Sequence, residues 1–236
     1  MRINDNWTSF KAVVLVCVMA LLTVQTAIAA PKSIKLTYEV KRNGKLFGNV
    51  TETYRQQGKE YQLKSITKGI GVYALLGERQ LTSQGDVTKD GLRPKHFESL
   101  QSTSSKKTLI NDFDWKARVL NMQVKGEKEQ AALEAGTQDL LSVMYQFMFK
   151  PPVVGPLKLS VTNGKRLKTH QYQVNSQTTP LVTDAGTFKV VELVEADDAD
   201  AKKIYLAVDK YALPVKIVVQ DDGATIEQLI TQITIE

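Results

Sequence analysis

The chain has 236 residues, a formal net charge of +6, and charged side chains at 24% of its positions. Hydrophobic residues make up 42% of it, which is enough for a globular core and excludes an intrinsically disordered chain. The single cysteine, Cys17, excludes a disulfide framework and any metal site built from several thiolates.

The N-terminus is predicted to be a secretory signal peptide covering residues 1–29. Arg2 and Lys11 precede an apolar segment, 12–22, that is too short to span a bilayer comfortably. The sequence that follows ends in Ala-Ile-Ala, the small-x-small pattern of a leader-peptidase site. We therefore expect cleavage after Ala29, a periplasmic location and no transmembrane segment once the leader is removed. An uncleaved N-terminal anchor is the alternative.

The remaining chain, 30–236, is predicted to form one domain, because no linker rich in Pro, Ser or Gly divides it. Without Arg2, Lys11 and Asp5 it keeps 29 basic and 24 acidic residues, a net charge of +5. These charges are dispersed rather than gathered in a basic patch, and an exported protein does not meet DNA or RNA. We therefore expect no nucleic-acid partner.

Most of this chain alternates apolar and polar residues between turn signals, which is typical of antiparallel strands. The first turn is Asn43-Gly44, a strong hairpin signal because both residues tolerate positive φ. The predicted strands cover residues 33–41, 46–54, a strand starting at 61, 78–87, 95–102, 108–115, 118–124, 156–161, 166–174, 181–184, 187–194, 203–208, 214–220 and 225–235. Residues 125–130 are predicted to be a charged loop.

One segment has helical rather than strand periodicity, and we predict the main α-helix at about 137–149. Thr137 is a suitable N-cap, and prolines at 151 and 152 prevent continuation. Leu140, Met144 and Phe147 share one face of this helix.

The fold class follows from these elements. Roughly a dozen strands are too many for one flat open sheet, so the protein is expected to be mainly β. We predict a curved antiparallel sheet or a partly open β-barrel, with the helix packed on or across it. A β-sandwich with a peripheral helix is the alternative.

An apolar run bounded by glycines, 69–77, interrupts the strands. Such a loop can close over a cavity, touch a membrane or form a partner surface. The preferred alternative is a buried connection or a short helical turn tucked against the core.

No catalytic motif is present. Asp112 and Asp114 share one face of a strand, but a solvated face explains them better than an acid–base pair. His96 and His170 lack metal-ligand spacing. Ser142 follows Asp139 by three residues, and a polar pair on the helix surface or a capping contact is preferred to a nucleophile. We therefore expect no enzyme activity, no cofactor and no metal.

Several short motifs, in this order, resemble those of a family of Gram-negative exported proteins catalogued only as a domain of unknown function. They are YEVKRNGKLFGNV from residue 38, Gly91-Leu92-Arg93-Pro94, Asp114-Trp115, Gln138-Asp139-Leu140-Leu141-Ser142, and Asp209 with Leu213-Pro214-Val215. The resemblance covers nearly all of the chain after the leader and implies an uncharacterised periplasmic β-rich protein. The expected shape is also similar to that of periplasmic lipoprotein and lipid carriers, a likeness of fold from which function does not follow.

The sequence supports two functional hypotheses. The first is a non-catalytic periplasmic protein that binds or carries an apolar or amphipathic, lipid-like ligand between the sheet and the helix. Its candidate ligand-binding residues are Ile70, Val72, Tyr73, Leu75, Leu76, Leu140, Met144 and Phe147. The second is a cell-envelope interaction or scaffold protein with a filled core, whose partner is another envelope protein.

Overall fold

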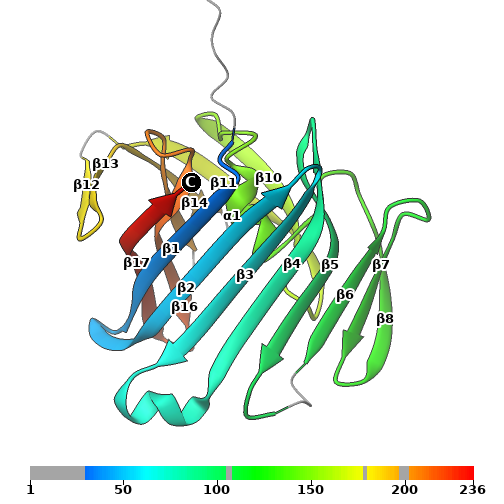
Figure 1. The fold of residues 1–236 in the computed structure, drawn as a ribbon, viewed down its shortest axis with the longest axis horizontal. Coiled ribbons are helices and arrows are strands. Elements are labelled where there is room, and N and C mark those ends of the chain that lie inside the picture. Colours follow the sequence, from blue (N-terminus) through cyan, green and yellow to red (C-terminus); the bar gives the residue numbers. More distant parts are fainter. Residues whose placement is uncertain (1–29, 105–107, 178–179, 197–201) are drawn as a thin grey trace, which may run out of the picture.

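The structure is a computed structural model that describes residues 30–104, 108–177, 180–196 and 202–236. The predicted leader lies outside these residues. Within them the chain forms seventeen strands and two short helices, so the prediction of a mainly β protein is confirmed. Fifteen strands belong to one sheet, in the order β8-β7-β6-β5-β4-β3-β2-β1-β17-β16-β15-β14-β11-β10-β9 (Figure 1).

The first half of the sheet is a meander of long strands. Its members are β1 (Ser33–Arg42), β2 (Lys45–Gln57), β3 (Glu60–Gly69), β4 (Glu78–Thr88) and β5 (Gly91–Gln101). The predicted hairpin between β1 and β2 is present, and Asn43 and Gly44 both have positive φ. Alternate side chains of β1 are buried, as the period of two predicted.

The second half of the sheet is reached through pairing of the C-terminal strand with β1. Its members are β10 (Gly155–Thr162), β11 (Leu167–Ser176), β14 (Val190–Glu195), β15 (Lys203–Ala207), β16 (Leu213–Asp221) and β17 (Ala224–Ile235). A separate small hairpin joins β12 (Leu181–Thr183) and β13 (Gly186–Phe188).

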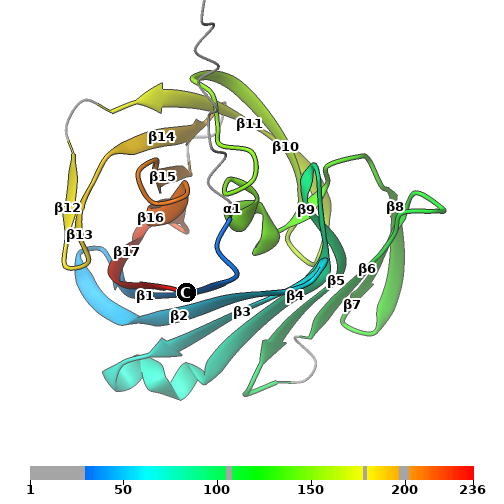
Figure 2. The same cartoon turned by 45° about the horizontal axis from the view of Figure 1, so that its top comes forward.

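The sheet curls into a partly open barrel with α1 (Ser142–Gln146) in its interior (Figure 2). The β10–β11 turn contacts the sheet at a second junction, opposite the β1–β17 pairing. There Asn111 donates a hydrogen bond to the Gly164 carbonyl oxygen at 3.0 Å and accepts one from the Thr162 hydroxyl at 2.7 Å. The strands β6 (Leu109–Asp114), β7 (Val119–Val124) and β8 (Glu127–Ala132) continue past this junction as a projecting flap. The curved single sheet is the predicted arrangement, and the β-sandwich alternative is not observed.

Two details of the sequence prediction are wrong. Residues 125–130 are not only a loop, because they contain the start of β8. The helix predicted at 137–149 is limited to Ser142–Gln146, and Gln138–Asp139 instead form β9, which pairs in parallel with the end of β10. Thr137 is not the N-cap: its hydroxyl is buried and has no hydrogen-bond partner among the described residues.

The connection between β3 and β4 is a short 3-10 helix, η1 (Gly71–Leu76). The short helical turn named in the alternative is therefore present, but none of its residues is buried, so it is not tucked against the core. No helix within the described ranges is long and apolar enough to cross a bilayer.

The antiparallel topology assigns each turn to one of two ends of the barrel. We call the end that holds the Asn43-Gly44 turn, η1 and the Asp222-Gly223 turn the lower end, as it lies in Figure 1. The connections β10–β11 and β14–β15 also belong to the lower end, because β11 and β14 continue the alternation. The start of β1 and the loop before β10 lie at the upper end.

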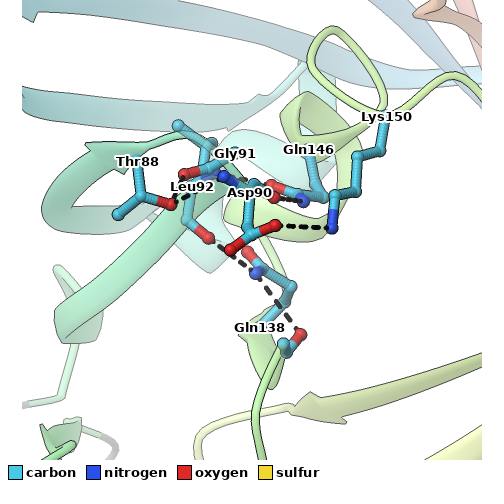
Figure 3. A network of polar contacts seen from close by, with 8 residues as sticks. Thr88, Asp90, Gly91, Leu92, Gln138, Gln146 and Lys150 are labelled. Carbon is cyan, nitrogen blue, oxygen red and sulfur yellow. Dashed lines mark hydrogen bonds and ion pairs between the residues drawn. The ribbon is translucent and has the colours of Figure 1, made fainter.

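Gln146 ties the helix to the turn between β4 and β5 (Figure 3). Its Oε1 accepts a hydrogen bond from the Leu92 amide at 2.6 Å, and its Nε2 donates to the Asp90 carbonyl oxygen at 2.9 Å. Gln138 adds a bond from its Nε2 to the Leu92 carbonyl oxygen at 2.9 Å. The segment before the helix and the last residue of the helix are therefore fastened to the same strand, β5.

We predict that Gln146→Ala lowers the free energy of unfolding by about 1–3 kcal/mol, because it leaves the Leu92 amide without its acceptor. Urea denaturation followed by circular dichroism measures this loss. Gln130→Ala is the matched control, since Gln130 bonds to Asn121 on the exposed flap. An equal effect of the two changes would contradict the fastening role of Gln146.

Candidate ligand-binding site

A buried aspartate holds the start of the helix. Asp139 is fully buried, and its Oδ1 accepts hydrogen bonds from the amides of Leu141 at 2.9 Å and Ser142 at 2.8 Å. Its Oδ2 accepts the Ser83 hydroxyl at 2.6 Å, and the Ser142 Oγ accepts the Asp139 amide at 3.0 Å. Burial raises the pKa of the Asp139 carboxyl, and these donors oppose the shift. Asp139 thus does the capping that the sequence assigned to Thr137.

A second buried carboxylate lies deeper in the barrel. Glu52 on β2 accepts hydrogen bonds from the Tyr145 hydroxyl at 3.0 Å and the Ser65 hydroxyl at 3.2 Å. Burial raises the pKa of the Glu52 carboxyl, and the two hydroxyls offset only part of that effect. The pKa of Tyr38 is also raised by burial and by Glu52, and its hydroxyl donates to the Pro214 carbonyl oxygen at 2.8 Å. Glu52 thereby joins the helix to the first half of the sheet.

Three tyrosine rings fill the space between these carboxylates. Tyr54 stacks on Tyr145, with ring centroids 5.9 Å apart, and on Tyr61 at 6.5 Å. The Tyr61 hydroxyl lies 3.0 Å from the Ser83 Oγ, which joins it to the Asp139 network. The side of the helix that faces β1–β4 is therefore packed, and its polar groups bond to one another.

The other side of the helix faces a cavity of about 270 Å³. We call its inner end, next to α1, the floor, and this is formed by Leu140, Val143 and Met144. The walls belong to β10, β11, β15 and β16. The apolar wall residues are Leu159, Val161, Ile204 and Val219. Because all these wall positions lie toward the ends of strands that meet the lower turns, the cavity lies in the lower half of the barrel.

The rim of this cavity is polar and mainly basic. Its charged and polar members are Asn163, Arg166, Lys168, His170, Tyr172, Glu195, Lys202 and Gln220. Lys168, His170 and Tyr172 alternate along β11 on one face, so the strand presents them to the same space. Glu195 contacts His170, with 2.5 Å between its Oε1 and the histidine Nδ1.

The basic character of the rim is shaped by its neighbours. Burial lowers the pKa of the Lys202 ammonium group, and the Glu195 carboxylate opposes that shift. The side chains of His170 and Glu195 are 24% and 11% exposed, so this pair is partly removed from water. An acidic group placed in the mouth would meet three basic side chains, Arg166, Lys168 and Lys202. The one carboxylate on the rim is that of Glu195.

The structure brings together only part of the predicted ligand-binding set. Leu140 and Met144 line the cavity, whereas Phe147 is buried in the main core and is absent from the cavity wall. The loop residues Ile70, Val72, Tyr73, Leu75 and Leu76 belong to η1 and its first flanking residue. They lie at the lower end, but they do not line this cavity. The idea that the loop closes directly over the helix is therefore not supported.

The residues considered for catalysis lie apart. Asp112 contacts His96 on the outside of the sheet, with 2.7 Å between Oδ1 and Nδ1, while Asp114 accepts the Ala117 amide at the turn that follows β6. Ser142 is fully buried, so its placement on the helix surface was wrong and its capping contact with Asp139 was right. Across the residues that the structure describes, no three His, Cys, Asp or Glu side chains are grouped as a metal site.

Hollows of about 640 and 480 Å³ also occur on the projecting flap. They are lined mostly by charged and polar residues, including Asp112 and Asn121 in both. A ligand there would remain largely in water. The cavity beneath α1 has an apolar floor inside the barrel, so it is the better candidate site.

The comparisons with known proteins agree with this fold. A family model described as "Protein of unknown function (DUF3108)" matches residues 37–231. No curated protein gives a significant match to the chain. Among solved structures, a beta-barrel-like protein of the domain of unknown function DUF1849 from Brucella abortus covers 88% of this chain and 100% of its own, with a TM-score of 0.58 and 11% identity. At that identity the likeness shows a shared barrel-like fold alone.

Proposed function

The chain belongs to the DUF3108 family of proteins of unknown function, and from its structure we propose that it is a non-catalytic binding or carrier protein for a small amphipathic ligand. The observation on which this depends is the cavity beneath α1, with Leu140 and Met144 in its floor. The predicted leader supports a periplasmic location for this activity.

The chemistry of the cavity indicates the class of ligand. An apolar floor and walls favour a hydrocarbon chain, at roughly 25 cal/mol for each Å² removed from water. The basic rim favours an acidic head group, which Arg166 can bind with two hydrogen bonds. The volume of about 270 Å³ lies at the lower limit of ligand pockets, so the ligand is a single-chain acid or another small amphipath rather than a whole multi-chain lipid.

The polar groups inside the barrel support a non-catalytic role. The side-chain oxygens of Asp139 and Ser142 accept hydrogen bonds from backbone amides at the start of the helix. Glu52 lies among Tyr145, Ser65 and the neighbouring tyrosines on the packed side of the helix. A ligand in the cavity would meet the opposite side of α1.

We predict that Leu159→Trp weakens binding of undecanoic acid by about tenfold or more, because the indole ring would fill space beside the apolar wall of the cavity. Isothermal titration calorimetry of the purified protein measures the affinity. Val182→Trp is the matched control, because Val182 is 72% exposed on β12 and lies outside the cavity. Equal affinity of Leu159→Trp and the unaltered protein, or no binding by the unaltered protein, would contradict the proposal.

The same titration tests whether the basic rim recognises the acidic head group, by comparing binding of the acid with binding of the alcohol. The double change Arg166→Ala and Lys168→Ala is expected to weaken binding of the acid and to leave binding of the corresponding uncharged alcohol unchanged. A similar loss for both compounds would indicate general damage to the site instead of recognition of the acid.

A scaffold role is the second candidate, and the exposed edge strand β8 favours it. All but one of the side chains of β8 are exposed, and the strand lies at the end of the fifteen-stranded sheet. Another strand can add to such an edge, although Glu127, Lys128 and Glu129 disfavour indiscriminate pairing. Site-specific crosslinking from β8 in cells tests this role: one recurrent envelope protein supports it, and the absence of any adduct contradicts it.

A further inference from the structure

The most exposed apolar side chains of the first half of the barrel gather at one point. Val72, Leu75 and Leu76 on η1 are 76%, 85% and 56% exposed, and Ile70 just before them is 38% exposed. Leu46, at the tip of the neighbouring β1–β2 hairpin, is 44% exposed. We call these five side chains the apolar tip. The backbone of η1 lies at the lower end of the sheet, beside the β1–β2 turn (Figure 1).

The backbone of the apolar tip is held in place. Gly71 and Gly77 both have positive φ, and a Cβ at Gly69 would collide with the carbonyl oxygen of Tyr73. The Tyr73 ring packs on Phe47, with ring centroids 4.5 Å apart. One aromatic side chain is therefore folded inward, while its apolar neighbours are directed into solvent.

Hydrogen bonds from both neighbouring strands complete this support. The Ile70 amide donates to the Phe47 carbonyl oxygen at 3.0 Å, and Gln101 donates from Nε2 to the Leu76 carbonyl oxygen at 2.6 Å. Thr103 donates its hydroxyl to the same oxygen at 3.3 Å. A loop fastened at both ends keeps its apolar side chains exposed, at a cost that a binding partner would remove.

The surroundings of the apolar tip are basic. Arg42 and Lys45 are exposed at the β1–β2 hairpin. Arg79, near the start of β4, is directed instead toward Ser99 on β5, with 3.5 Å between its Nε and the serine Oγ, and burial lowers the pKa of its guanidinium group. Lys68 forms a surface ion pair with Glu78 at 2.7 Å, so these two charges offset each other. The acidic residues Asp221 and Asp222 lie at the β16–β17 turn, on the far side of the β1–β2 hairpin from η1. Arg42 and Lys45 are therefore the two cations beside the apolar tip.

We propose that the apolar tip docks on the surface of a phospholipid bilayer with anionic head groups. A small group of exposed aliphatic side chains can insert between lipid head groups. Each flanking cation adds about 1 kcal/mol of attraction to an anionic surface, a contribution that salt weakens. The cavity beneath α1 lies in the same lower half of the barrel, so docking would turn its basic rim toward the membrane.

The test is flotation of the purified chain, without its leader, with vesicles of phosphatidylcholine alone or mixed in equal parts with phosphatidylglycerol. The unaltered protein is expected to float with the mixed vesicles at low salt and much less at high salt or with phosphatidylcholine alone. The double change Val72→Ser and Leu75→Ser is expected to weaken partitioning by about tenfold or more. Val153→Ser with Val154→Ser is the matched control, because these valines are 81% and 61% exposed at the upper end.

A second readout avoids dependence on one variant. Leu75→Trp is expected to show a blue shift of its fluorescence when mixed vesicles are added, and Val153→Trp is expected to show none. Equal flotation of the two double-serine variants, or equal spectra of the two tryptophan variants, would overturn the proposal. Docking does not require a ligand in the cavity, so a protein that floats but fails to bind undecanoic acid would retain this inference and lose the proposed function.

Discussion

Asp139→Ala is expected to lower the free energy of unfolding by about 3–5 kcal/mol. The carboxylate is fully buried and accepts the Leu141 and Ser142 amides on one oxygen and the Ser83 hydroxyl on the other. Alanine would leave three buried donors without an acceptor, at about 1–3 kcal/mol each before the chain relaxes. Urea denaturation followed by far-ultraviolet circular dichroism measures the loss.

Asn at this position separates the two roles of the carboxylate. The amide oxygen of Asp139→Asn can still accept the Leu141 and Ser142 amides, but its NH₂ group cannot accept the Ser83 hydroxyl. We therefore expect the free energy of unfolding of Asp139→Asn to lie between that of the unaltered protein and that of Asp139→Ala. Asp112→Ala, at the exposed contact with His96, is the control and is expected to change stability by less than about 1 kcal/mol. A loss of that small size for Asp139→Ala would contradict the capping role.

Asp139 also explains why the predicted helix was too long. Leu140, Met144 and Phe147 have helical spacing, and this local pattern correctly identified a buried segment. The start of the helix is set by two contacts with distant parts of the chain: pairing of Gln138–Asp139 with the end of β10, and the bond to Ser83. Neither contact has a signal in the local sequence, because parallel pairing of two residues has no periodicity of its own.

The strands were more predictable than the site. Alternation and turn residues identified the long strands, because each buries one face in the core. The short strand β12 was predicted almost as observed, at 181–184, whereas β13 and β14 were predicted as one strand, 187–194. Of the cavity, Leu140 and Met144 could be predicted from helical periodicity alone. The rim residues Arg166, Lys168 and Lys202 resemble a solvated face in the sequence, because a barrel interior near its mouth is polar too. Their position is visible only once the sheet has closed.

The pH dependence of stability provides the second large effect, and it depends on Glu52. Burial raises the pKa of this carboxyl in the folded state, so the folded protein holds the proton more tightly than the unfolded chain does. The stabilisation from the protonated form is complete below the unfolded pKa and is lost as the pH rises through the folded pKa. This group therefore lowers the free energy of unfolding by up to about 1.4 kcal/mol for each pH unit in that interval. The raised pKa of Asp139 acts in the same direction.

Glu52→Gln isolates this contribution, because the amide keeps an acceptor near the Tyr145 and Ser65 hydroxyls without a titrating proton. Urea denaturation from mildly acidic to neutral pH is expected to show a smaller decline for Glu52→Gln than for the unaltered protein. Glu60→Gln, at an exposed position on β3, is expected to follow the unaltered protein. Glu52→Ala is expected to cost about 3 kcal/mol at mildly acidic pH, because it leaves a void and two buried hydroxyls without their acceptor. The cost is expected to fall as the pH rises, because the unaltered protein then loses the stabilisation from its protonated Glu52. Parallel pH profiles for Glu52→Gln and the unaltered protein would mean that Glu52 titrates alike in both states, and the link between the helix and β2 would then involve a carboxylate that water still reaches.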